Sequence, residues 1–128
     1  MSLALLGGSA PLVELHLVLG FALIALLVAI LLVGLSAALR RPRPPRLYFP
    51  LHTIAAGLLV VEVLIGLVLL ATGRRPRDTL HLLYGVAALA TMPIARSMIS
   101  TNPERAKWYH LGASVFLFGL LVRLATTG

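Results

Sequence analysis

The chain has 128 residues, of which 59% are hydrophobic and only 12% are charged, and its mean hydropathy is +1.00. Soluble domains contain about 25% charged residues, so a water-soluble fold of this composition could not cover its surface with polar groups. The same apolar content excludes a disordered chain. Without cysteine, disulfides, zinc–thiolate sites and iron–sulfur clusters are excluded as well. The composition therefore predicts a membrane protein.

Four apolar stretches follow one another along the chain, at approximately residues 12–39, 47–72, 79–95 and 107–126. Each is close to the roughly 20 residues that a helix needs to cross a bilayer, and a helix satisfies its own backbone groups in lipid. The third stretch is expected to end near Pro93, and Asp78 is expected to cap the start of its helix. The sequence therefore predicts an all-α fold, an integral membrane antiparallel four-helix bundle that forms one domain over residues 1–128.

The net charge of +7 comes mainly from Arg residues clustered between the apolar stretches. Such clusters are typical of loops at a membrane surface, so no nucleic-acid partner is expected. The first and third connections carry seven Lys or Arg residues, against four in the second connection and the C-terminal segment. The positive-inside rule therefore places both termini outside the cytoplasm, in a multi-pass protein of the cell inner (plasma) membrane.

One histidine falls in the opening turns of each predicted helix. The four are His16, His52, His81 and His110. Since successive helices run in opposite directions, the first and third histidines are expected in an outer layer and the second and fourth in an inner layer, roughly 20 Å apart. A single intramembrane histidine is often only a polar contact between helices, but ionisable groups at matched depth in every helix indicate a function.

This separation excludes a single metal site with four histidine ligands, because a metal–imidazole bond is only about 2 Å long. Two histidines on non-adjacent helices are natural axial ligands for haem iron, whereas a bare ion would be under-coordinated. The pattern predicts two b-type haems, with His16 and His81 on the outer iron and His52 and His110 on the inner iron.

Small side chains stand one turn after each histidine, on the same face of the helix, where a flat macrocycle needs room. They are Gly20, Ala56, Gly85 and Ser114, and they are expected to contribute to cofactor binding. Small residues are also enriched at any transmembrane helix interface, which is the alternative explanation.

Charged residues near the two layers also have expected roles. The expected partners of the haem propionates are Arg74, Arg75 or Arg77 in the outer layer and Arg46, Arg105 or Lys107 in the inner one. Glu62 is expected near the middle of the second helix, away from both layers, as a protonated carboxyl bonded to a neighbouring helix. A proton relay and a contact with a partner subunit are the alternatives for Glu62.

With this layout the chain resembles the cytochrome b561 family. The resemblance rests on His16, His52, His81 and His110 and covers the whole four-helix chain, without the ascorbate-binding features or flanking helices of the longer eukaryotic members. It implies transmembrane electron transfer through two bis-histidine haems, as a module or as a subunit of a larger redox complex with quinone or other redox subunits as partners. Bis-histidine iron has no open position, so we expect a redox carrier without catalytic residues, acting as an oxidoreductase only with a quinol or protein partner.

Two alternatives stay open. The first is an oxidase-assembly or haem A synthase-like accessory membrane protein, although the Glu-x-x-His-Arg motif of haem A synthases is matched only in part by Glu14-Leu15-His16-Leu17. The second is a cofactor-free structural subunit.

Overall fold

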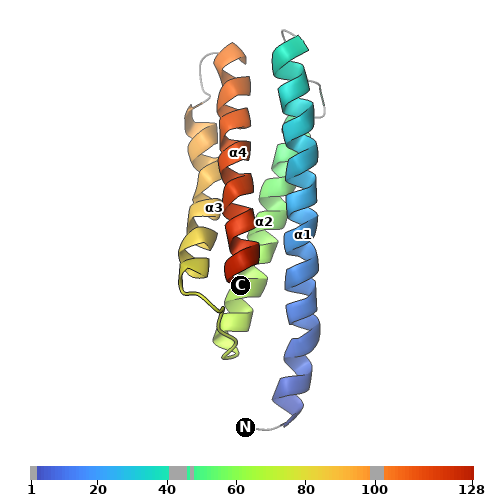
Figure 1. The fold of residues 1–128 in the computed structure, drawn as a ribbon, viewed down its shortest axis with the longest axis vertical. Coiled ribbons are helices and arrows are strands. Elements are labelled where there is room, and N and C mark those ends of the chain that lie inside the picture. Colours follow the sequence, from blue (N-terminus) through green and yellow to red (C-terminus); the bar gives the residue numbers. More distant parts are fainter. Residues whose placement is uncertain (1–2, 41–45, 47, 99–102) are drawn as a thin grey trace.

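The computed structural model describes residues 3–40, 46, 48–98 and 103–128, and its regular secondary structure is entirely helical. Four helices follow one another along the chain (Figure 1): α1 (Leu3–Arg40), α2 (Tyr48–Ala71), α3 (Leu80–Met98) and α4 (Pro103–Thr127). The prediction of an all-α fold with four helices is confirmed.

The helices are longer than the apolar stretches that predicted them. α1 begins nine residues before residue 12, at Leu3, and runs through Pro11, because Leu and Ala, both good helix formers, fill its first turn. α3 continues through Pro93 to Met98, since one missing N–H removes only one helical hydrogen bond. α4 starts at Pro103, where proline is favoured because the first N–H of a helix has no partner anyway.

The connection between α2 and α3 is fixed at both ends. Gly73 follows α2 with a φ of +86°, in the left-handed region that commonly closes a helix. At the other end, the Asp78 carboxylate accepts a hydrogen bond of 2.9 Å from the Leu80 N–H, which confirms the predicted cap. The Asp78 N–H also donates to the Thr127 carbonyl at 3.2 Å. The start of α3 is thereby tied to the end of α4.

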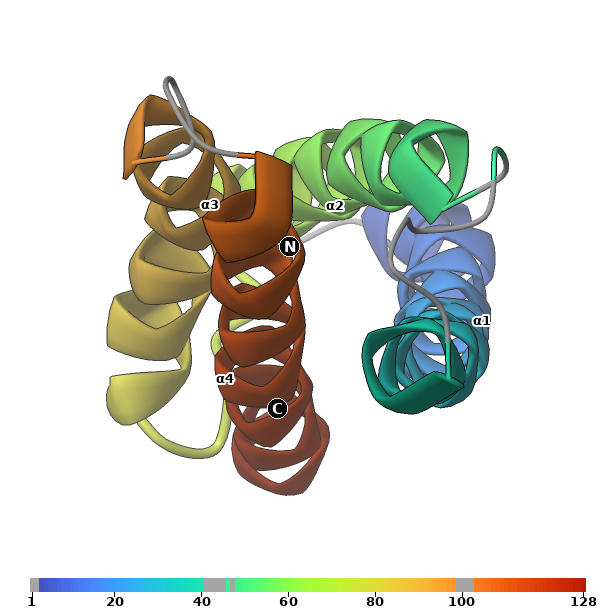
Figure 2. The same ribbon diagram turned by 90° about the horizontal axis from the view of Figure 1, so that it is seen from above.

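The four helices lie side by side around a common core. α1 packs against α2 and α4, and α3 packs against α4 and, less extensively, against α2. As a result α1 lies diagonally opposite α3, and α2 lies diagonally opposite α4 (Figure 2). The core consists of Leu23, Leu27, Ile30, Ala55, Leu59, Ala88, Met92, Leu117 and Leu121.

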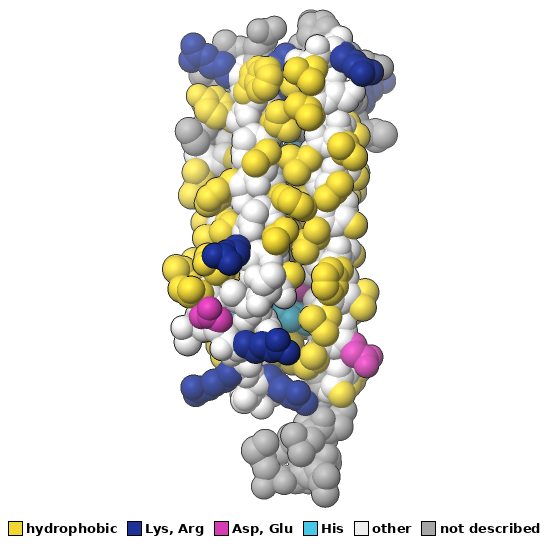
Figure 3. All heavy atoms as spheres, in the orientation of Figure 1, with side chains coloured by type: hydrophobic (Ala, Val, Ile, Leu, Met, Phe, Trp, Pro, Cys, Tyr) yellow, Lys and Arg dark blue, Asp and Glu magenta, His cyan; other side chains and the backbone are white. Residues whose placement is uncertain are grey.

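The outer surface of the helices is apolar. Of the described helices, three contain segments that are long and apolar enough to cross a membrane, namely Ala10–Arg40, Pro50–Ala71 and Arg105–Thr127, and α3 is not among them. Large hydrophobic side chains are nevertheless exposed on α3 too, as Val86 shows with 67% exposure. On the face in Figure 3 the Lys and Arg side chains gather mostly toward the two ends, with hydrophobic side chains between them. These features indicate a membrane protein whose surface is compatible with lipid contact.

Candidate functional site

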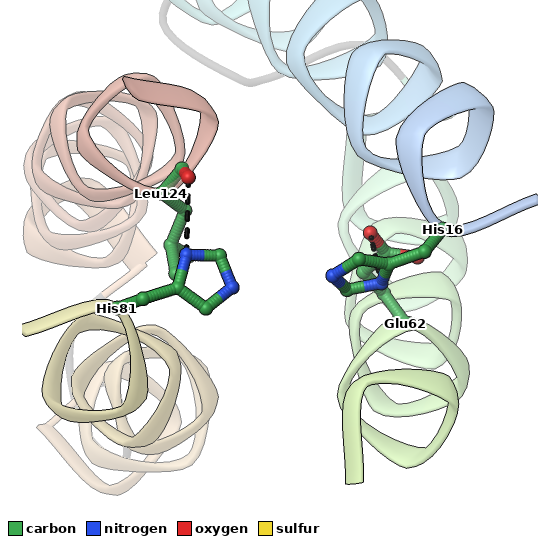
Figure 4. Close-up of polar contacts among 4 residues, drawn as sticks. All are labelled: His16, Glu62, His81 and Leu124. Carbon is green, nitrogen blue, oxygen red and sulfur yellow. Dashed lines mark hydrogen bonds and ion pairs between the residues drawn. The ribbon is translucent and has the colours of Figure 1, made fainter. Parts of the chain in front are cut away.

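His16 from α1 and His81 from α3 meet across the diagonal of the four helices. Their ring centres lie 6.2 Å apart, and the ring planes are inclined by 69°. Figure 4 shows that the Nε2 edge of each ring points toward the other, while each Nδ1 points toward its own side of the structure. The two side chains are partly exposed. Two imidazoles from non-adjacent helices thus present the same kind of nitrogen to a shared space.

Both Nδ1 atoms of this pair lie beside oxygen atoms. His81 Nδ1 is 3.1 Å from the Leu124 carbonyl oxygen and 3.3 Å from the Thr127 hydroxyl, both at the end of α4. His16 Nδ1 is 3.0 Å from Glu62 Oε1 on α2, at ion-pair distance but not aligned as a hydrogen bond. An acceptor at Nδ1 favours the tautomer that leaves the Nε2 lone pair available, which is how metal-binding histidines are commonly held.

Glu62 therefore does not lie where the sequence predicted it. The expectation that it stands away from both histidine layers is wrong, because its carboxylate contacts His16. The reason is that α2 extends past the level at which α3 begins (Figure 1), so this level is crossed by the middle of α2 and not by its end. The expected bond to a neighbouring helix is present, since His16 belongs to α1.

The second pair, His52 from α2 and His110 from α4, meets across the other diagonal. These rings are buried, with 2% and 4% exposure, and their centres lie 4.8 Å apart with an inclination of 47°. Ser114 Oγ donates to the His110 carbonyl at 2.8 Å and lies 3.3 Å from His52 Nε2. A hydroxyl has one hydrogen, so His52 Nε2 is the donor to Ser114.

The two pairs differ in how well they fit a shared iron. Two imidazoles on opposite sides of one iron, each about 2 Å from it, place their ring centres roughly 6 Å apart. The His16/His81 pair, at 6.2 Å, fits this spacing as it stands. The His52/His110 pair, at 4.8 Å, fits only if the rings separate by more than 1 Å and His52 Nε2 gives up its contact with Ser114.

The distance between the two pairs can be estimated along two of the helices. Glu62, which touches the first pair, follows His52 of the second pair by ten residues on α2. At about 1.5 Å per residue this corresponds to about 15 Å. On α4, Leu124, which contacts His81 of the first pair, follows His110 of the second pair by 14 residues, or about 21 Å. The separation is therefore close to the roughly 20 Å expected from the sequence.

The four small residues that follow the histidines have different surroundings. A Cβ on Gly20 would lie 3.1 Å from Glu62 Oε1, whereas a Cβ on Gly85 would meet no described atom within 4 Å. Ala56 packs against the core, and Ser114 contacts His52. Of the four small residues, only Gly85 has the open space that a macrocycle needs, whereas Gly20 makes room for the Glu62 carboxylate.

One feature beside the histidines was not expected from the sequence. Arg96 on α3 donates a hydrogen bond of 2.8 Å to the Thr53 hydroxyl, next to His52 in the chain. The residues expected to pair with haem propionates lie toward the two ends of the helices. Those of the α2–α3 connection, Arg74, Arg75 and Arg77, are exposed, and the others, Arg46, Arg105 and Lys107, stand near the other end. The sequence did not indicate an arginine close to the second pair, because the third helix is expected to end near Pro93, whereas α3 continues to Met98.

An open apolar groove of about 500 Å³ runs between α3 and α4. Its lining includes Ala87, Ala90, Gly112, Ala113, Trp108 and Phe116. Small side chains on both helices let an apolar molecule approach the backbone closely.

No protein-family model, curated protein or solved structure matches this chain.

Proposed function

We propose that this chain is a membrane-embedded antiparallel four-helix bundle that transfers electrons across the bilayer through two b-type haems. The observation that carries the proposal is the His16/His81 pair, with a ring spacing of 6.2 Å and both Nε2 edges facing inward. Two imidazoles alone would leave a bare metal ion under-coordinated, whereas a porphyrin supplies the remaining four ligands of an iron. The haem supplies reversible one-electron chemistry.

The histidines of this chain would hold the two irons in pairs, His16 with His81 and His52 with His110. The second pair accepts a haem only after its rings move apart, so it is the less prepared of the two. Arg96 and the arginines of the α2–α3 connection are placed to pair with haem propionates at the two levels. Bis-histidine ligation leaves no iron position for oxygen, so the chain acts as a carrier.

The electron donor and acceptor must reach the haems from the membrane or its surface, since the loops are short. We propose quinols, small molecules or neighbouring redox subunits, and the groove between α3 and α4 is suited to an apolar molecule of the quinol class. The distribution of Arg supports an orientation with both termini outside the cytoplasm and a location in the cell inner (plasma) membrane. α3, which is not among the helices long and apolar enough to cross a membrane by themselves, would cross the bilayer as part of the bundle, with Thr91 buried among the helices.

The test is the reduced-minus-oxidised visible spectrum of the purified protein, with haem quantified per chain. We expect two low-spin b-type haems. His81→Ala should remove the haem of the first pair and His52→Ala that of the second, whereas Glu14→Gln, an exposed substitution near His16, should keep both. Wild-type protein purified from haem-replete cells without haem bands would overturn the proposal, and so would equal loss of both haems in each histidine variant.

A further inference from the structure

We infer that Glu62 is a positioning residue for His16: its carboxylate orients the imidazole toward His81 and stabilises the oxidised form of an iron bound between them. This inference rests on the proposed function for the haem, but its first half concerns the chain alone. The sequence favoured a structural bond for Glu62, with a proton relay or a contact with a partner subunit as the alternatives. The contacts of this residue, the glycines around it and its burial support a more specific role.

The contact itself fixes the direction of the His16 ring. Glu62 Oε1 lies 3.0 Å from Nδ1, on the opposite side of the ring from the Nε2 edge that faces His81 (Figure 4). A carboxylate beside Nδ1 favours the tautomer with its proton there, and the lone pair is then on Nε2. The same pairing of carboxylate and histidine holds ligands in many metal sites and raises their basicity.

Two glycines on different helices make room for this arrangement. A Cβ on Gly20 of α1 would lie 3.1 Å from Glu62 Oε1, and a Cβ on Gly66 of α2 would lie 3.3 Å from His16 Cε1. Both distances are shorter than ordinary van der Waals contact. A side chain at either position would therefore push the carboxylate or the imidazole out of place.

The burial of Glu62 is more than an interhelical bond requires. The residue is 8% exposed, and Oε2 is buried without a hydrogen-bond partner among the described residues. A charge at this depth is costly unless an opposite charge compensates it. A ferric iron in a porphyrin dianion, held by two neutral imidazoles, carries one net positive charge. An ionised Glu62 beside its ligand would neutralise this charge.

This arrangement has a directional consequence for electron transfer. A carboxylate beside a ligand of a bound iron would stabilise the more positive, ferric state more than the ferrous state, so Glu62 would favour the ferric state. His81 faces a neutral carbonyl, that of Leu124, and exerts no comparable effect. Glu62 therefore lowers the reduction potential of the haem between His16 and His81 and leaves that of the other haem unchanged.

The experiment compares wild type with Glu62→Gln and with Glu14→Gln, which removes the same charge from an exposed position two residues before His16. Redox titration should show the potential of one haem shifted to a more positive value in Glu62→Gln and both potentials unchanged in Glu14→Gln. Glu62→Ala should weaken haem binding at this pair by about 10- to 100-fold, as is typical when the partner of a metal-binding histidine is lost.

A second measurement uses the haem-free protein and is independent of the proposed function. Nitrogen NMR of ring-labelled histidine should show His16 with its proton on Nδ1 in wild type and in Glu14→Gln, and a mixture of tautomers in Glu62→Ala. A haem-free wild type with this tautomer would overturn the haem but keep the positioning role. Two haems with unaltered potentials in Glu62→Gln, or an unchanged His16 tautomer in Glu62→Ala, would overturn the inference.

Discussion

Ser114 gives a direct test of the His52/His110 pair, because it contacts the nitrogen that would bind iron. Ser114 is fully buried, its hydroxyl hydrogen is donated to the His110 carbonyl, and its oxygen lies 3.3 Å from His52 Nε2. While Ser114 donates to the His110 carbonyl, its oxygen can only accept from His52 Nε2, so this contact favours the tautomer with the proton on that nitrogen. Before this nitrogen can bind an iron, the proton must move and the contact with Ser114 must break.

The substitution Ser114→Ala removes this competing contact. The net worth of one hydrogen bond in a protein is about 0.5–1.5 kcal/mol, and the bond between His52 and Ser114 is at the long end of the accepted range. Its loss should therefore strengthen haem binding at this pair by about twofold to tenfold, since about 1.4 kcal/mol corresponds to a factor of ten. The hydroxyl bond to the His110 carbonyl contributes little, because that carbonyl also has the helix as a source of donors.

The assay is a haem titration of the apo protein in detergent, followed in the Soret band, with His81→Ala as the background so that only the second pair binds. The His16/His81 pair provides the internal control: in a His52→Ala background, Ser114→Ala should leave its affinity unchanged. Weaker or equal binding at the second pair in Ser114→Ala would refute the reasoning, since it would mean that the hydroxyl supports the bound haem.

Two further predictions concern the membrane. Leu27 is fully buried, whereas Leu32 is 65% exposed. Since lipid and the protein interior are similarly apolar, Leu27→Ala should lose mainly its packing and lower the free energy of unfolding in bicelles by about 2 kcal/mol, whereas Leu32→Ala should lower it by less than about 0.5 kcal/mol. Equal costs would contradict the assignment of core and lipid-facing sides. Because the chain has no cysteine, a membrane-impermeant maleimide on intact cells should label Arg75→Cys directly but Arg40→Cys only after permeabilisation; the reverse pattern would invert the proposed orientation.

The helices could be predicted from the sequence because long apolar stretches separated by Pro and Arg have few other interpretations. Their ends could not, since hydropathy and proline mark where a helix leaves the apolar range and not where its hydrogen bonds stop. The extension of α1 to Leu3 and of α3 past Pro93 both follow from this. The second extension mattered for function, because it brings Arg96 into a helix that contacts α2.

The pairing of the histidines across the two diagonals could be anticipated because one histidine per helix, with alternating helix direction, allows few other arrangements. The role of Glu62 could not. Counting residues from the loops assumes that each helix ends at the height in the bundle at which the next helix begins. α2, however, continues beyond the height at which α3 begins, so the start of α3 lies at the level of Glu62 and not at the end of α2. Only the relative height of the helices, which packing of the core decides, brings the carboxylate to His16.

The surroundings of the two histidine pairs prepare them unequally for the proposed haems. At the His16/His81 pair, oxygen atoms already occupy both Nδ1 positions and the ring spacing matches a shared iron, so little has to change when a haem binds. At the His52/His110 pair, burial and the contact with Ser114 hold the rings together, so a haem must first separate them. In the proposed di-haem protein, a carboxylate beside the first pair and an arginine near the second would also bias the two irons in opposite directions, because negative charge favours the ferric state and positive charge the ferrous state. If the proposed haems are bound, with about 15 to 21 Å between the levels, electrons would pass downhill from the first pair to the second.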